Sequence, residues 1–277
     1  MSRKTIVILF LVLPWLVLFS PLFAKASNGT IDDIELTEVI VSETEEDFIG
    51  DEVAYGHLFV YKPQNYSDSK KYNTLYIFEG LNSTENDALD AEGIRFLESL
   101  FADGMEDILV VVVPHVVYDE LTFAEIINKI DGSYSTIQKS SGRIIAGFSN
   151  GAYYIWNNVL VTPQYYSMAD TYIPMSPIGA REILSGNFSS IKYAYKRIKI
   201  YNSCGTEGAE ADYRGLYSGE EQMELIIENG RKYGYIEGKN IFRYQSEGDH
   251  NWIQGWGALC EVLPNIVGKK DIFSGLN

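Results

Sequence analysis

Short runs of apolar residues alternate with amphipathic stretches along most of the chain. The run Ile108–Val113 is rich in β-branched residues and is stopped by Pro114, which is typical of a buried strand in a parallel sheet. Ala88–Ala102 instead repeats its apolar residues at helical spacing. The same criteria predict strands at Ala54–Tyr61, Thr74–Phe78, Ile108–Val113, Arg143–Gly147, Tyr172–Met175, Arg197–Ser203 and Ile241–Tyr244, and helices at Ala88–Ala102, Leu121–Ile137, Asn150–Val161, Glu220–Tyr233 and Asn251–Ile266. Because the two kinds of element alternate with short connections, we predict one α/β domain, a mainly parallel sheet with helices on both faces.

The N-terminus has the features of a signal peptide. Arg3 and Lys4 precede an almost unbroken apolar run over Thr5–Ala24, and Ala24-Lys25-Ala26 fits the pattern that a signal peptidase reads. The alternative is an uncleaved anchor, since the run is long enough to span a bilayer, but two prolines within it favour cleavage. We therefore expect residues 1–26 to be removed near Ala26, leaving residues 27–277 as one exported domain, periplasmic or secreted.

Charge and cysteine content narrow the classes of partner. With 22 basic and 38 acidic residues the net charge is −16, and such a surface repels nucleic acid and anionic lipid headgroups. We expect a small-molecule partner instead. Three histidines and no Cys-x-x-Cys argue against a structural metal site. The two cysteines, Cys204 and Cys260, permit either one disulfide or two buried thiols.

One motif carries a candidate nucleophile. Gly147-Phe148-Ser149-Asn150-Gly151 matches Gly-x-Ser-x-Gly, and it lies between a predicted buried strand and a predicted helix. The two glycines permit a sharp turn that lifts the serine hydroxyl clear of the sheet, where the start of the helix favours developing negative charge. The alternative is an ordinary strand-to-helix turn with a capping serine. We interpret Ser149 as a nucleophile.

A nucleophilic serine needs a base, and there are three histidines. His57 falls within a predicted strand, whereas His115 follows a central strand and is a rival that would line a pocket. His250 lies in the loop between the last strand and the last helix, which gives the chain order nucleophile, acid, histidine. We therefore predict His250 as the general base.

The carboxylate that orients the base should lie after the strand Arg197–Ser203. Glu207, Glu210 and Asp212 all lie in this loop, and its length alone does not choose among them.

Five motifs in order resemble an esterase family of the α/β-hydrolases, the group of S-formylglutathione hydrolases, feruloyl esterases and enterochelin-type esterases. Besides Gly147–Gly151, the nucleophile elbow, these are Val60–Tyr66, Lys71–Gly80, Ile130–Thr136, and Gly248–Trp252 with Trp256. Glu79 stands where the family usually has Asp or His. The resemblance implies the α/β-hydrolase fold and esterase activity without a metal or organic cofactor.

The resemblance also implies site residues. Ser149 would be the nucleophile, His250 the base, and the backbone N–H groups of Leu81 and Asn150 the oxyanion hole. Glu207 is favoured as the acid, although Gly205-Thr206-Glu207-Gly208 is one residue out of step with the family pattern. Some enterochelin-type members work without an acid, so the resemblance also allows a Ser–His dyad.

The expected reaction is hydrolysis of a carboxylic ester through an acyl-enzyme. Two alternatives stay open: an acyltransferase on the same fold, and a non-catalytic exported binding protein that retains the elbow. About twenty residues, Ser176 to Lys196, separate two consecutive strands, which is too few for a lid domain. We therefore expect an open site that prefers short acyl chains.

Overall fold

The computed structural model describes residues 29–35, 39–41, 52–54, 56–81, 83, 86–177, 187–212 and 218–269. The predicted signal peptide, residues 1–26, lies outside these ranges. Within them, no helix combines the length and the apolar character that crossing a membrane would require.

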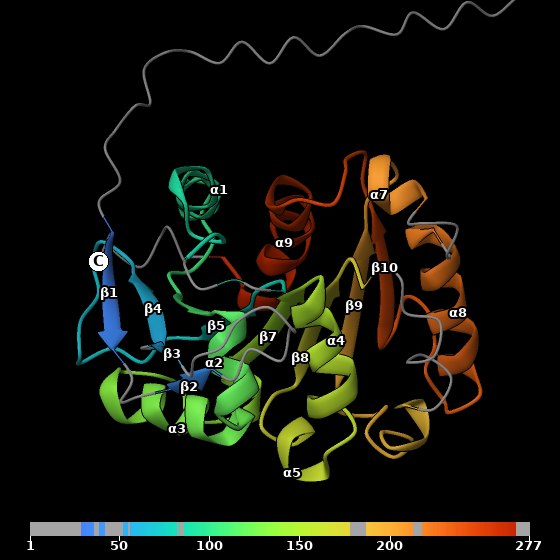
Figure 1. Cartoon of the computed structure of the whole chain (residues 1–277), viewed down its shortest axis with the longest axis horizontal. Coiled ribbons are helices and arrows are strands. Elements are labelled where there is room, and N and C mark those ends of the chain that lie inside the picture. The colour runs from blue at the N-terminus through green and yellow to red at the C-terminus, as the bar shows by residue number, and fades with distance from the viewer. Residues whose placement is uncertain are drawn as a thin grey trace, which may run out of the picture.

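An eight-stranded sheet forms the centre of the molecule, with strand order β1-β4-β6-β5-β7-β8-β9-β10 (Figure 1). The strands are β1 (Thr30–Glu35), β4 (His57–Lys62), β5 (Thr74–Phe78), β6 (Leu109–Val113), β7 (Arg143–Phe148), β8 (Thr171–Met175), β9 (Lys199–Cys204) and β10 (Ile241–Gln245). From β6 to β10 neighbouring strands run parallel, whereas β4 is antiparallel to both β6 and β1. The predicted mainly parallel sheet is therefore confirmed. A small separate sheet pairs β2 (Val39–Val41) with β3 (Glu52–Ala54).

Helices cover both faces of the sheet. In Figure 1, α1 (Ala91–Ala102) and α9 (Trp252–Val267) lie above it, and α2 (His115–Glu120), α3 (Phe123–Ser133), α4 (Asn150–Tyr154) and α5 (Pro163–Tyr166) lie below. The core divides in the same way, because side chains alternate along a strand. In β6, Leu109, Val111 and Val113 pack toward α3 and α4. Val110 and Val112 pack toward α1 and α9.

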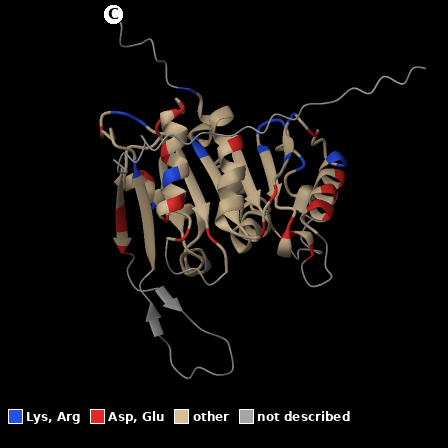
Figure 2. Cartoon of the chain, turned by 90° about the horizontal axis from the view of Figure 1, so that it is seen from above, with Lys and Arg blue, Asp and Glu red and all other residues tan. Residues whose placement is uncertain are grey.

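Acidic side chains gather on α8 (Gly219–Arg231), which covers the edge of the sheet near β10 (Figure 2). Its carboxylates belong to Glu220, Glu221, Glu224 and Glu228.

Three predicted elements differ from the structure in more than small shifts of their ends. The predicted strand Ala54–Tyr61 is divided, since Ala54 ends β3 and His57 begins β4. The predicted helix Leu121–Ile137 is shorter, because Thr122 and Glu125 form a reciprocal cap that starts α3 at Phe123. The helix predicted over Asn150–Val161 is α-helical only to Tyr154 and continues as one π-helical turn, Ile155–Val159.

Parallel strands bring their carboxyl ends to one edge of the sheet, where sites form in folds of this kind. The residues that follow β5, β7, β8, β9 and β10 meet there. The predicted site residues lie in these connections, apart from Asn150, which begins α4.

Candidate active site

Ser149 lies on a sharp turn between β7 and α4. Its backbone has φ 53° and ψ −115°, a conformation that residues other than glycine rarely adopt. The turn is close-packed, since a Cβ on Gly151 would overlap the backbone carbonyl of Phe78. The Ser149 N–H donates to the Met175 oxygen at 3.0 Å, which ties the turn to β8. The strand–turn–helix context predicted for Ser149 is therefore present.

The backbone groups predicted as an oxyanion hole lie beside Ser149. A Cβ on Gly80 would lie 3.6 Å from the Ser149 Cβ, so the chain leading into Leu81 passes next to the serine. Asn150 is the first residue of α4, and its side-chain amide donates to the Tyr118 hydroxyl at 3.4 Å. The backbone N–H groups of Leu81 and Asn150 donate to no acceptor among the described residues. The oxyanion-hole role of these two amides stays a prediction.

His250 lies in the connection between β10 and α9, as predicted. Its ring packs on Phe148, the residue before Ser149, with ring centroids 4.7 Å apart. Trp252 packs on the same phenyl ring at 4.9 Å. In the part of the chain described, no hydrogen bond joins the His250 ring to the Ser149 hydroxyl. The packing on Phe148 places the His250 ring against the residue that precedes Ser149.

The carboxylate that pairs with His250 belongs to Glu210, and the prediction of Glu207 for this position is wrong. Glu210 Oε1 lies 2.7 Å from His250 Nδ1, and the Glu210 side chain is fully buried. Glu207 is exposed and precedes the short helix α7 (Gly208–Ala211). Its N–H donates to the Gly248 oxygen at 3.0 Å, which fixes the chain before α7 turns Glu210 inward. Asp212 follows α7 and is also exposed.

The second oxygen of Glu210 faces the first turn of α8. A Cβ on Gly219, the first residue of that helix, would lie 3.0 Å from Glu210 Oε2. The side chain of Cys204 fills the other side of the same space. Glycine at position 219 leaves the room that Glu210 occupies.

The other two histidines have different surroundings. His57 Nδ1 lies 2.6 Å from Asp33 Oδ1, between β4 and β1, at the opposite end of the strand order from β10. His115 begins α2, and its backbone N–H donates to the Ser83 hydroxyl at 3.1 Å. The His115 ring contacts the edge of Tyr118. His115 is therefore linked to Asn150 through Tyr118, whereas Glu210 pairs with His250.

Cys204 and Cys260 are free thiols, so the disulfide that the sequence permits is not formed. Among the described residues, no group of three His, Cys, Asp or Glu side chains is arranged to hold a metal ion.

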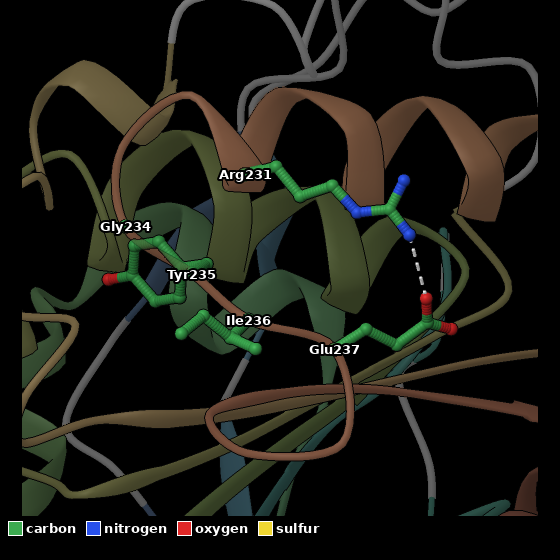
Figure 3. Close-up of a pocket in the computed structure, with 5 residues that line it drawn as sticks. All are labelled: Arg231, Gly234, Tyr235, Ile236 and Glu237. Carbon is green, nitrogen blue, oxygen red and sulfur yellow. Dashed lines mark hydrogen bonds and ion pairs between the residues drawn. The ribbon is translucent and has the colours of Figure 1, made fainter.

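A pocket of about 510 Å³ lies between the end of α8 and the start of β10 (Figure 3). It is lined by Arg231, Gly234, Tyr235, Ile236 and Glu237, and an ion pair of 3.0 Å joins Arg231 to Glu237. These residues precede β10, whereas the candidate site follows it. The pocket therefore opens at the opposite edge of the sheet and is separate from the site.

No family model matches the chain. Solved structures do resemble it. A feruloyl esterase module from Clostridium thermocellum, solved with sinapinate, is 17% identical with a TM-score of 0.64, covering 87% of this chain and 89% of that one. A fluorophosphonate-binding serine hydrolase from Staphylococcus aureus is 14% identical with a TM-score of 0.60, covering 87% and 99%. An S-formylglutathione hydrolase from the same organism is 15% identical with a TM-score of 0.57, covering 87% and 98%.

These similarities extend over most of every chain compared. The protein therefore has the α/β-hydrolase fold, as its sequence predicted. The solved structures that it resembles include a feruloyl esterase module and an S-formylglutathione hydrolase.

Proposed function

We propose that the protein is a serine hydrolase that cleaves carboxylic esters, with Ser149 as nucleophile, His250 as general base and Glu210 as the acid. The observation that carries the proposal is the 2.7 Å contact between His250 and Glu210, beside a serine held in a strained turn. A strained residue among polar groups at a sheet edge is characteristic of catalytic sites. The named activities of the similar structures support the same reaction class.

The reaction follows from the roles of these groups. Ser149 Oγ attacks the ester carbonyl while the imidazole of His250 accepts its proton, and the amides of Leu81 and Asn150 hold the oxyanion. The proton then passes to the leaving alcohol, and water attacks the acyl-enzyme by the same route. Glu210 accepts a hydrogen bond from Nδ1–H and so keeps the other ring nitrogen available to the serine.

The direct test is labelling by a fluorophosphonate together with hydrolysis of p-nitrophenyl acetate. The native protein should show both, and Ser149→Ala should show neither while its unfolding temperature stays close to the native value. Transfer of the acyl group to an added alcohol in preference to water would identify an acyltransferase. A native protein that neither labels nor turns over would contradict the proposal and favour a binding protein.

The substrate we propose is a small ester with a short acyl chain. The connection from Ser176 to Lys196 is too short for a lid domain, and each methylene that a lid or groove would bury is worth about 0.8 kcal/mol. Acetate and butyrate esters should therefore react faster than palmitate esters. Rates that rise steadily with chain length would contradict this part of the proposal.

We also propose that the protein is exported, because residues 1–26 combine a basic start, an apolar run and a cleavage pattern. N-terminal sequencing of the protein from its own cells should give a start at or near Ser27. An intact Met1 in the membrane fraction would indicate an anchor.

A further inference from the structure

Two connections hold the acid and the base, and hydrogen bonds join them. We call residues 205–212 the acid loop and residues 246–251 the base loop. The backbone N–H groups of Thr206 and Glu207 both donate to the Gly248 oxygen, at 3.1 and 3.0 Å. These bonds fix the start of the acid loop. They end three residues before Glu210, whose own N–H donates to the Glu207 oxygen at 2.9 Å within the acid loop.

Asp249 provides a contact one residue away from the acid. Its Oδ1 accepts the N–H of His250 at 2.7 Å and the N–H of Ala209 at 2.8 Å. Ala209 immediately precedes Glu210 in the chain. One carboxylate oxygen therefore holds the backbone of the base and the backbone next to the acid at the same time.

The acid loop is shaped to receive this carboxylate. Gly208 has φ +51°, and a Cβ at that position would overlap the carboxyl group of Asp249. A side chain other than hydrogen would therefore meet both an unfavourable backbone conformation and the carboxylate. The N–H groups of His250 and Ala209 lower the pKa of Asp249, with a smaller contribution from the charge of His250. The carboxylate is thus ionised at neutral pH, the form that accepts both bonds.

We propose that Asp249 is a positioning residue whose carboxylate sets the distance between Glu210 and His250. The role rests on the proposed function, because the pair it positions is the acid and the base of that reaction. A charge-assisted bond from a backbone N–H is stronger than one to a neutral acceptor. Losing both would let the acid loop move relative to the base, and a displacement of about 1 Å at a catalytic group lowers turnover by about 100-fold.

The test compares Asp249→Ala, Asp249→Asn and Glu247→Gln. Glu247 is exposed, lies in the same loop and serves as the matched control. Asp249→Ala should lower kcat about 10- to 100-fold with little change in KM, because the loops and not the substrate contacts are altered. Asp249→Asn keeps an acceptor oxygen and should recover most of the loss. Glu247→Gln should match the native protein.

A spectroscopic signature separates positioning from general destabilisation. The Nδ1 proton of a histidine bonded to a carboxylate gives a far-downfield proton resonance. That resonance should be present in the native protein, Asp249→Asn and Glu247→Gln, and lost in Asp249→Ala. It does not depend on turnover, so it also distinguishes failure of this proposal from failure of the proposed function.

A second variant keeps the test decisive if Asp249→Ala folds poorly. Gly208→Ala displaces the Asp249 carboxylate from the opposite side, so it should reproduce both the loss of kcat and the loss of the resonance. Native kcat in either variant would overturn the proposal. A retained downfield resonance in either variant would overturn it too, even if activity fell.

Discussion

In the proposed site, the side of the nucleophile Ser149 is shaped by backbone packing, whereas the acid–base side with Glu210 and His250 is held by hydrogen bonds between loops. On the nucleophile side, Ser149 and the glycines around it lie within five consecutive residues, tightly packed against the end of β5. On the acid–base side, both the Glu210–His250 contact and the Asp249–Ala209 bond join residues 40 positions apart. The Ser149 side is therefore determined by residues that are close in the sequence, whereas the Glu210–His250 side forms only after the strands have assembled.

The difference explains why the sequence identifies one half better than the other. A tight turn requires glycines at fixed spacing, and that requirement is visible as a motif. The orientation of a carboxylate in a loop depends on partners that arrive from another connection. In the acid loop, these partners are the Gly248 oxygen and the Asp249 carboxylate.

The largest expected effect is a difference in kcat between variants of two carboxylates in the acid loop, Glu210 and Glu207. Glu210→Gln should lower kcat on the order of 10³–10⁴-fold, because an amide does not hold the required tautomer of His250. Glu207→Gln should leave kcat close to the native value, since Glu207 is exposed and makes its contact through the backbone. Steady-state kinetics on one short ester would decide. Comparable losses in the two variants would show that the loop rearranges in solution.

A glycine substitution tests how rigid the nucleophile side is. Gly151→Ala forces a Cβ against the Phe78 carbonyl and should lower the free energy of unfolding by about 3 kcal/mol, measured by urea titration. Gly132→Ala is the control, because Gly132 lies in α3 with open space around it. The control should gain about 0.5–1 kcal/mol. A Gly151→Ala protein as stable as the native one would mean that the turn relaxes easily.

Two carboxylates, Glu79 and Asp249, should make the stability of the protein depend on pH in opposite directions. Burial raises the pKa of Glu79 from 4.5 to about 7, although the Ala88 N–H and the Ser83 hydroxyl act against the shift. Between these values the folded protein binds more protons than the unfolded chain, so Glu79 makes stability fall as pH rises. Asp249, whose pKa is lowered, contributes stability that is lost only as pH falls below its ordinary value of 3.8.

Glu79→Gln removes the first of these titrations while keeping an acceptor for the Ala88 N–H, which Glu79 binds at 2.7 Å. Relative to the native protein, the variant should become more stable by up to about 3 kcal/mol between pH 5 and pH 8. Urea titrations at both pH values measure this change. Glu106→Gln, at an exposed position, should show no such trend. A flat difference for Glu79→Gln would mean that Glu79 ionises as it does in water.

The smallest effect concerns the thiols. Cys204 ends β9 just before the acid loop, and Cys260 lies in α9 beyond the base. A bridge between them would tie the two elements with about 2–4 kcal/mol. Because both are free, and burial raises their pKa values to about 12 and about 11, a reductant should change neither turnover nor the unfolding temperature. A drop of several degrees would reveal a bridge.

Much of the fold was predictable because buried parallel strands are apolar on both faces. Thr74–Phe78 has the predicted bounds, and β6 and β8 differ from their predicted ranges by one residue. Helix boundaries were less accurate. The cap at Thr122 and the π-helical turn after Tyr154 depend on side-chain and tertiary contacts that apolar spacing does not report.

As with the fold, only part of the candidate site could be predicted from the sequence. Ser149 lies on the predicted turn, and the His250 ring packs on Phe148, the residue before it. Glu207 was preferred over Glu210 because a family pattern counts residues from the strand end, whereas burial depends on where α7 turns. Asp249 was missed altogether. Nothing in Gly248-Asp249-His250 marks its carboxylate as a partner of Ala209, 40 residues away.

The backbone of Ser149 has a consequence for any attempt to improve this protein. Its positive φ costs a residue with a side chain on the order of 1–3 kcal/mol, and glycine would adopt the same conformation freely. A library screened for heat resistance alone should therefore favour glycine at this position and enrich for inert molecules. Directed evolution of the protein therefore needs a selection for the activity that depends on the Ser149 hydroxyl, in addition to a selection for a high melting temperature.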